Sequence, residues 1–456
     1  MFSYHLLSKT PVDLLALHQL NPQRYPFLLE SVAAGHGHAR FDILFAFPQQ
    51  AIVLDAQYGL WVDGRKASHG DFLDQLDMSW QQARQPRQAA IDIPFRGGWF
   101  VYLGYELAQQ IETTLNLPAA EDDFPTAFAV RMPAAFVQDH LLGQTYFMVE
   151  QTFSDLLPEM QSDFSQLGLH QRVKCQSPID IQLIEEDANI YLNNIEKILK
   201  YIKDGDIFQV NLSRQWGGVL PIEHSVINLY AKLREQNPAP FSGLVHWDDS
   251  YIVSSSPERL VKVTADKVQV RPIAGTAARQ AQDDEAGLDQ QHKQALIQHP
   301  KERAEHIMLI DLERNDLGRV CVAGSVKVDE LMVLESYAHV HHIVSNVVGT
   351  LDAQYSPGRL IKAVFPGGTI TGCPKVRCME IIAELEQARR RAYTGSMGYL
   401  NHDGDLDLNI LIRTIEQHKT AIFFRAGAGI VADSQASREL AETRAKAKGL
   451  IMALQQ

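Results

Sequence analysis

Two short alternating segments separated by a turn constrain this chain more than any other feature. Glu258–Val263 and Lys267–Arg271 alternate between apolar and polar side chains, and Thr264–Asp266 can turn between them. The second segment runs into Pro272 and Gly275, residue types that end strands and let backbone approach a ligand closely. The pattern predicts an antiparallel hairpin whose open end lies at a binding site.

The open end of this hairpin carries an acidic side chain. Because cross-strand partners in a hairpin sum to a constant, Glu258 is predicted to lie opposite Ile273 and Ala274. A carboxyl group would then face position 274, where the side chain is only a methyl group.

Length and composition restrict the class of protein. The chain has 456 residues, 45% of them apolar, and a formal net charge of -13, which argues against a nucleic-acid-binding or membrane-binding surface. The sequence contains no apolar run of 18 or more residues and no signal-peptide pattern at its start. Its four cysteines show no CxxC spacing, so we expect reduced thiols and a cytoplasmic location.

The chain divides into two predicted regions. Residues 1–165 mix short strands and helices, the polar stretch 161–182 is the candidate boundary, and residues 185–456 carry the stronger signals. Within the second region, Ala188–Lys203 predicts a helix and Ile207–Ser213 predicts a strand. The predicted fold class is α+β, with large, mostly antiparallel sheets.

Two predicted helices carry paired carboxylates. Glu302 and Glu305 are three residues apart and share a helix face, as do Glu439 and Glu442 near the C-terminus, with Lys446 one turn further on. Mg²⁺ prefers a few protein oxygens and leaves other positions to water and substrate. Either pair alone would instead favour a solvated helix surface with an i,i+4 Glu–Lys pair.

Further residues are suited to binding an anion. Glycine-rich backbone at 426–430 can offer N–H groups to an anion, and Arg413 can clamp a carboxylate with Tyr399 adding a hydroxyl. His342 offers an imidazole. The alternative interpretation is a set of turns, a surface arginine and a structural histidine.

Five motifs, taken together, carry a resemblance that spacing alone does not supply. In chain order they are Ser256–Arg259, Arg271–Thr276, Ala304–Asp316, Gly368–Lys375 and Glu442–Lys446. The chain resembles the chorismate-utilising enzymes, which include anthranilate, aminodeoxychorismate, isochorismate and salicylate synthases. The resemblance implies the anthranilate synthase component I-like fold of two packed antiparallel sheets with helices outside. In that reading, 1–165 is the N-terminal region and 185–456 binds chorismate.

The resemblance also implies the metal and the acid. Glu305 and Glu442 would be the principal Mg²⁺ ligands, with Glu302 and Glu439 assisting through water. Glu258 resembles the family's general acid, which needs a raised pKa to keep its proton.

Chorismate itself would contact a larger set of residues. His342 and Thr369 would position the ring. The expected substrate-binding residues are Tyr399, Arg413, Gly427, Ala428, Gly429, Lys446, Gly275 and Thr276.

Position 209 separates water chemistry from ammonia chemistry in this family. Members that add water carry a lysine there, whereas this chain has Gln209, which cannot deprotonate water but can guide ammonia. No cysteine lies in a glutaminase-like context, so the resemblance implies a separate glutamine amidotransferase subunit that supplies the ammonia.

Two aminations of chorismate remain, at ring carbon 4 with pyruvate retained or at ring carbon 2 with pyruvate lost. Five segments are similar to aminodeoxychorismate synthases, which act at carbon 4: Arg40–Ile43, Gln209–Leu212, Asn237–Ser242, Ser256–Arg259 and Phe365–Gly368. The expected activity is therefore that of aminodeoxychorismate synthase component I, in para-aminobenzoate and folate synthesis.

Two features of the chain are instead similar to anthranilate synthases, which keep the alternative open. Ala274 replaces the lysine expected at carbon 4 amination, and Leu29, Glu30 and Ser31 resemble a tryptophan-binding segment.

Overall fold

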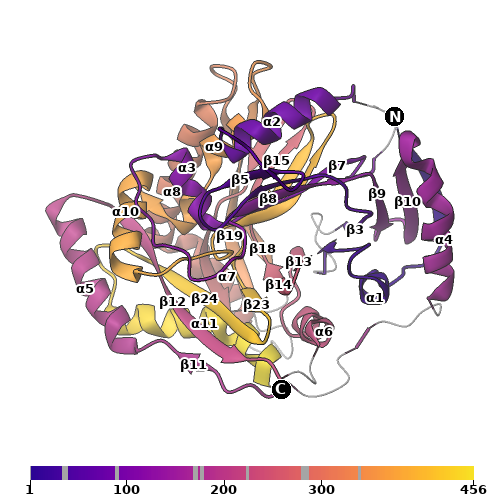
Figure 1. Ribbon diagram of the computed structural model, residues 1–456. Helices are drawn as coiled ribbons and strands as arrows, with labels where there is room; N and C mark the ends of the chain where they lie inside the picture. Colours follow the sequence, from indigo (N-terminus) through magenta and orange to yellow (C-terminus); the bar gives the residue numbers. More distant parts are fainter. Residues whose placement is uncertain are drawn as a thin grey trace.

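Two large antiparallel sheets pack face to face and form the body of the protein (Figure 1). The computed structural model describes residues 2–32, 40–87, 92–167, 173–174, 179–221, 225–278, 287–336 and 340–455. All strand pairings in these ranges are antiparallel, and helices lie outside the sheets. The predicted α+β class is confirmed.

Within the described residues, the first sheet has twelve strands. Their order is β1 (Phe2–Ser8), β10 (Gln144–Glu150), β9 (Ala134–Asp139), β3 (Phe41–Ala46), β2 (Phe27–Glu30), β13 (Phe241–Trp247), β14 (Ser250–Ser256), β23 (Thr414–His418), β24 (Ala421–Ile430), β12 (Gln209–Val219) and β11 (Ile184–Glu185), with β20 (Gly372–Cys373) paired to β12.

The second sheet also has twelve strands. Their order is β17 (Ile273–Ala278), β19 (Val340–Thr350), β16 (Lys267–Val270), β15 (Arg259–Thr264), β22 (Leu406–Asn409), β21 (Ser396–Asn401), β7 (Gly98–Leu103), β8 (Ala127–Met132), β4 (Ala51–Leu54), β5 (Leu60–Val62) and β6 (Arg65–Lys66), with β18 (Lys327–Ser336) paired to β19. Both predicted regions contribute strands to both sheets, and their division into folding units stays a prediction.

Helices cover the outer faces of both sheets. They are α1 (Leu15–Leu20), α2 (Phe72–Ala83), α3 (Ala108–Ile111), α4 (Leu157–Gln166), α5 (Ala188–Asp204), α6 (Val226–Gln236), α7 (Leu288–Gln298), α8 (Pro300–Gly318), α9 (Pro357–Val364), α10 (Lys375–Glu386) and α11 (Ala436–Gln455), with 3-10 turns η1 (Tyr105–Leu107), η2 (Gln151–Leu156) and η3 (Gly368–Ile370). None of the helices within the described residues has both the length and the apolarity that crossing a bilayer requires.

The core lies between the sheets and beneath the helices. Aromatic side chains of the two sheets meet in the middle layer, where the Phe27 and Phe100 rings stack with centroids 4.1 Å apart. Helices α2, α8 and α9 cover the second sheet, and α6 and α11 cover the first. Burial on both faces makes the sheets a rigid frame for the loops between them.

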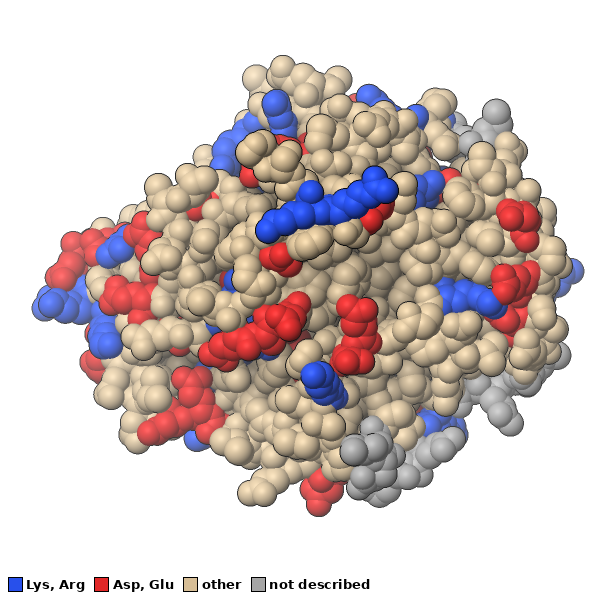
Figure 2. All heavy atoms as spheres, in the orientation of Figure 1, with Lys and Arg blue, Asp and Glu red and all other residues tan. Residues whose placement is uncertain are grey.

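Local sequence signals set the helix ends. Asp187 caps α5 by accepting a hydrogen bond from the Asn189 amide, and Gly205 ends the helix with a φ of 87°. The predicted helix over 188–203 is thus confirmed to within one residue. Acidic and basic side chains are interspersed on the face shown in Figure 2.

Candidate active site

Glu258 lies in the short connection between β14 and β15, with its side chain directed into the protein. It is 6% exposed, and its carboxylate accepts a hydrogen bond of 2.8 Å from Thr369 Oγ1 in η3. Burial raises the pKa of Glu258 to about 7, while the Thr369 hydrogen bond and the Lys446 charge lower it. A carboxyl group with this pKa can hold and release a proton near neutral pH.

The predicted hairpin forms, but its open end pairs differently from the prediction. Lys262 pairs with Gln269, with the same constant sum that relates Glu258 to Ile273. The ladder between β15 and β16 ends there, and Ile273 pairs instead with Val344 of β19. β17 continues along β19 the pairing that β16 makes with the same strand, and the Glu258 carboxylate contacts Thr369 of η3.

The predicted contact between Glu258 and the side chain of residue 274 stays a prediction. The Ala274 and Thr276 backbones belong to β17 and pair with Ile343 and His342, but the side chains of both lie outside the described part of the structure.

Gln209 lies at the start of β12, on the face of the strand that bears polar residues. Its side chain is 8% exposed, and a Cβ at Gly429 of the adjacent strand β24 would lie 2.4 Å from its Nε2. Gly429 therefore leaves the space that the Gln209 amide occupies. Ala428, one residue along, has its side chain on the opposite face, in an apolar cluster with α5 and α10.

The backbone carbonyl and amide of Gly427 point away from the neighbouring strand β12. The Gly427 carbonyl accepts a hydrogen bond of 3.0 Å from Lys446 Nζ. Because the amide and carbonyl of one strand residue point to the same side, the Gly427 and Gly429 amides face away from the β12 ladder and the Ala428 amide faces it. The predicted anion contact therefore rests on the two glycine amides.

Two cations lie near these amides. Lys446 of α11 forms an ion pair of 2.7 Å with Glu442. The half-buried Arg413 has a φ of 54°, and its guanidinium makes no hydrogen bond or ion pair among the described residues. Burial lowers the pKa of Arg413, while Tyr393 and Glu442 raise it. A half-buried guanidinium without a hydrogen-bonded carboxylate partner is suited to a carboxylate ligand.

Tyr393 is the tyrosine that the structure brings to this group, and the sequence prediction missed it. A Cβ at Gly427 would lie 2.6 Å from the Tyr393 hydroxyl, and Tyr393 interacts electrostatically with Arg413. Burial raises the pKa of Tyr393 to about 12, so the hydroxyl stays protonated. Tyr399 lies elsewhere, in the layer between the sheets, where its ring packs edge-on against Phe95 at 6.0 Å. The sequence alone could not show which of the two tyrosines lies beside Arg413.

His342 lies on β19 beside the same cations. Its Nδ1 is 3.4 Å from the Gly275 carbonyl. Burial lowers the pKa of His342 to about 4, and the nearby Arg413 and Lys446 charges add to this effect. The imidazole is therefore neutral at physiological pH and can donate or accept a hydrogen bond without carrying charge.

The four predicted metal ligands come from α8 and α11. Glu302 packs over Gly275, where a Cβ would lie 2.8 Å from its Oε2. Glu439 is buried, Glu305 is half-buried and Glu442 is exposed. Carboxylate oxygens suit Mg²⁺, which takes few protein ligands and keeps several waters. In the ranges that the structure describes, no three His, Cys, Asp or Glu side chains are grouped closely enough to hold a metal ion.

The predicted tryptophan segment lies on β2 and just after it. The Glu30 carboxylate accepts hydrogen bonds from the Tyr230 hydroxyl at 2.6 Å and from Arg234 at 2.9 Å. Ser31 Oγ donates to the Pro240 carbonyl at 3.2 Å, and Leu29 is half-buried against the layer between the sheets. Internal partners thus already occupy the polar groups of this segment.

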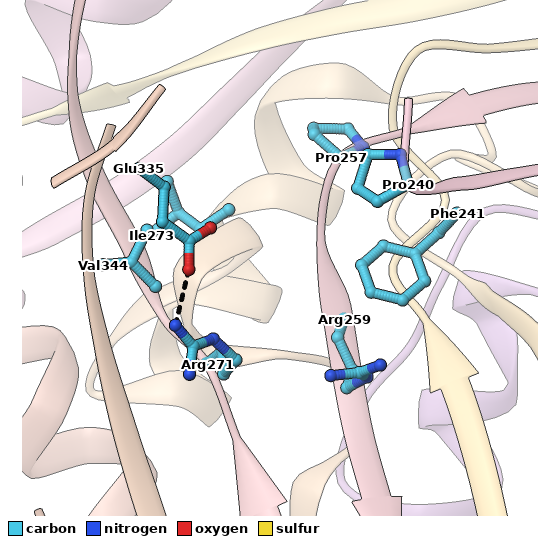
Figure 3. Close-up of a pocket in the computed structure, with 8 residues that line it drawn as sticks. All are labelled: Pro240, Phe241, Pro257, Arg259, Arg271, Ile273, Glu335 and Val344. Carbon is cyan, nitrogen blue, oxygen red and sulfur yellow. Dashed lines mark hydrogen bonds and ion pairs between the residues drawn. The ribbon is translucent and has the colours of Figure 1, made fainter. Parts of the chain in front are cut away.

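A small pocket lies next to chain neighbours of Glu258. It is lined by Pro240, Phe241, Pro257, Arg259, Arg271, Ile273, Glu335 and Val344 (Figure 3). Arg271 is paired with Glu335 at 2.5 Å, and Arg259 lies over the Phe241 ring at 4.8 Å. Pro240, whose carbonyl accepts the Ser31 hydrogen bond, and Pro257, which precedes Glu258, both line this pocket.

A comparison with known proteins identifies the class. The family model of chorismate binding enzymes matches residues 27–452. An anthranilate synthase component I-like protein of Synechocystis sp. is 40% identical over 390 residues, covering 84% of this chain and 78% of that protein. Aminodeoxychorismate synthase component 1 of Bacillus subtilis is 40% identical over 372 residues, covering 79% and 77%.

A solved structure agrees with these relatives. Anthranilate synthase component I of Streptococcus pneumoniae superimposes with a TM-score of 0.81 at 29% identity, covering 90% of this chain and 92% of that one. The chain belongs to the chorismate-binding enzyme family. Its anthranilate synthase component I-like fold and the predicted family membership are confirmed.

Proposed function

We propose that this chain is the chorismate-aminating component of an aminodeoxychorismate synthase, which adds ammonia at ring carbon 4 and retains the enolpyruvyl group. The observation that carries the amination is Gln209, whose buried amide lies beside Gly429 where a water-adding relative needs an ionisable base. The choice of carbon 4 rests on the five local segments that resemble aminodeoxychorismate synthases.

The side chains act on the substrate in distinct roles. Arg413, Lys446 and the Gly427 and Gly429 amides bind the substrate carboxylates. This is supported by the hydrogen bond of Lys446 to the Gly427 carbonyl and by the interaction of both cations with Glu442. Tyr393 provides the hydroxyl that the sequence assigned to Tyr399. Neutral His342 and the β17 backbone at Gly275 and Thr276 position the ring.

Glu258 is the proposed general acid. It donates its proton to the departing ring hydroxyl, and Thr369 holds the carboxyl in place. Glu305 and Glu442, with Glu302 and Glu439 through water, would hold Mg²⁺. When bound, the ion supplies a Lewis acid next to the ring carboxylate. Because position 274 is alanine, ammonia attacks the ring without a lysine adduct.

The ammonia comes from a separate glutamine amidotransferase subunit in this proposal. The relatives named as component 1 support it, since such a name presupposes a second component. Tryptophan at Leu29–Ser31 would have to displace Tyr230 or Arg234 from Glu30, so effector binding there would be accompanied by rearrangement.

Incubation of the full chain with chorismate, Mg²⁺ and an ammonium salt at mildly alkaline pH tests the proposal. The expected product is 4-amino-4-deoxychorismate with no pyruvate, and omission of Mg²⁺ abolishes turnover. Release of pyruvate with fluorescent anthranilate would instead establish carbon 2 amination, the second candidate, which Ala274 and the equally similar anthranilate synthase relative favour. Formation of isochorismate would overturn the role of Gln209.

A further inference from the structure

Two buried side-chain amides lie next to each other on the site face of β12. Gln209 is 8% exposed and Asn211 is 9% exposed. They are two residues apart in one strand, so both project to the same face, opposite the apolar Val210 and Leu212. This face is directed toward Gly427 and Gly429 of β24.

The side-chain oxygens of both amides lack a hydrogen-bond partner within the described residues. Gln209 Oε1 and Asn211 Oδ1 are buried without a hydrogen bond. An unsatisfied buried acceptor is unfavourable by about 1–3 kcal/mol, so such atoms are rare in native proteins and are completed by a ligand, an ion or ordered water where they occur. Two such atoms on adjacent positions of one strand face indicate one ligand site.

The surroundings hold the Asn211 backbone but leave its side chain available. The Asn211 backbone N–H donates to the Thr371 carbonyl at 2.8 Å, and Arg390 Nη2 donates to the Asn211 backbone carbonyl at 2.6 Å. A Cβ at Gly427 would lie 2.6 Å from Asn211 Oδ1. Glycine at 427 thus makes room for the Asn211 amide, as Gly429 does for Gln209.

The chemistry of two acceptors selects the ligand. Ammonia has three N–H donors and one lone pair, whereas water has two donors and two lone pairs. Two amide oxygens can accept two X–H groups of either molecule and leave a lone pair directed at the ring. Neither oxygen can take up the proton that attacking water must lose, whereas ammonia adds to give a stable ammonium group, so two neutral amides favour ammonia. The nearby cations Lys446 and Arg413 are suited to the substrate's carboxylates rather than to a neutral amine.

We propose that Asn211 is a second ammonia-positioning residue, which together with Gln209 holds the nucleophile by paired amide oxygens and favours ammonia over water. The inference rests on the proposed amination and adds the residue that orients its nucleophile.

Steady-state kinetics of the full chain with an ammonium salt tests this. Asn211→Val removes the hydrogen-bond acceptor and keeps a side chain of similar size. We expect the KM for ammonium to rise about tenfold, because one hydrogen bond to ammonia is lost. The KM for chorismate should change less than twofold. The fraction of water adduct should rise as well. Asn211→Asp keeps an oxygen acceptor and should keep the ammonium KM within about twofold.

The control is a buried asparagine outside the site. Asn194 in α5 is 7% exposed and donates to the Leu385 carbonyl at 2.9 Å. Asn194→Val should lower Tm without changing the KM for ammonium. If Asn211→Val is inactive, a tenfold rise of the ammonium KM in Asn211→Asp overturns the inference.

The outcomes also separate this inference from the proposed function. An ammonium KM unchanged in Asn211→Val, or a rise confined to the chorismate KM, overturns the role of Asn211 and leaves the amination standing. Absence of any aminated product from the unmodified chain overturns both.

Discussion

At the scale of single residues, the environment of Glu258 decides its chemistry. The carboxyl group is enclosed by protein, and its described hydrogen-bonding partner is the Thr369 hydroxyl at 2.8 Å. Burial raises its pKa to about 7, and the Thr369 hydrogen bond opposes this shift because it favours the ionised form. Activity that requires the protonated acid should therefore fall as pH rises above about 7.

Thr369→Val tests this electrostatic account. Removing the hydroxyl leaves burial unopposed by that hydrogen bond, so the pKa of Glu258 should rise and the alkaline limb of kcat against pH should move to higher pH at saturating ammonia. Thr371→Val is the control, because the Thr371 hydroxyl bonds to the Gly367 carbonyl and does not contact Glu258. A limb that moves to lower pH, or moves equally in both variants, would contradict the assignment.

The two tyrosines show what residue type alone leaves undecided. Tyr393 and Tyr399 are six positions apart. Tyr393 follows an arginine-rich segment, and Tyr399 follows a segment that contains glycine. The chain bends between them into β21, so Tyr399 enters the layer between the sheets while Tyr393 stays beside Gly427. The position of each hydroxyl therefore depends on how β21 packs.

At the scale of elements, helix ends follow local rules closely. Proline at the first position begins α8 and a left-handed glycine ends α5, as the sequence predicted. The β15–β16 hairpin also forms in the predicted register. These features depend on neighbours within a few residues, which is why the sequence alone was sufficient.

Gly205 and Gly318 provide a matched test of helix termination. A Cβ at either glycine would meet no atom within 4 Å, but only Gly205 has a positive φ, of 87°. Gly205→Ala should lower the free energy of unfolding by about 1 kcal/mol, the strain of a left-handed alanine. Gly318→Ala should be neutral or raise it by up to about 1 kcal/mol. Urea unfolding measures both, and equal effects would refute the conformational explanation.

At the scale of the whole molecule, burying carboxyl groups between two large sheets makes stability depend on pH. Glu416 is 7% exposed, and burial raises its pKa to about 8, with Arg391 and the Ala392 amide opposing and Glu106 and Asp122 reinforcing the shift. The folded protein thus keeps a proton that the unfolded chain releases. Its contribution is present at low pH and lost as pH rises through about 8.

Unfolding measured between pH 6.5 and 8.5 should reveal this effect. We expect the free energy of unfolding to fall across the range, with about 2 kcal/mol of the fall due to Glu416. Glu416→Gln should flatten the profile by that amount, because glutamine does not titrate. A profile of unchanged slope would show that Glu416 ionises in the folded state as it does in the unfolded chain.

The sequence by itself determined the helices, the hairpin, the family motifs and the residue types of the site, because periodicity, caps and turns act over a few neighbouring residues. Only the tertiary structure decided that β17 pairs with β19 and that Tyr393 rather than Tyr399 joins Arg413. It also decided that the Asn211 side-chain oxygen, on the same strand face as Gln209, has no hydrogen-bond partner among the described residues. Those outcomes depend on burial and on contacts between strands far apart in the chain. Local pattern carries no information about either.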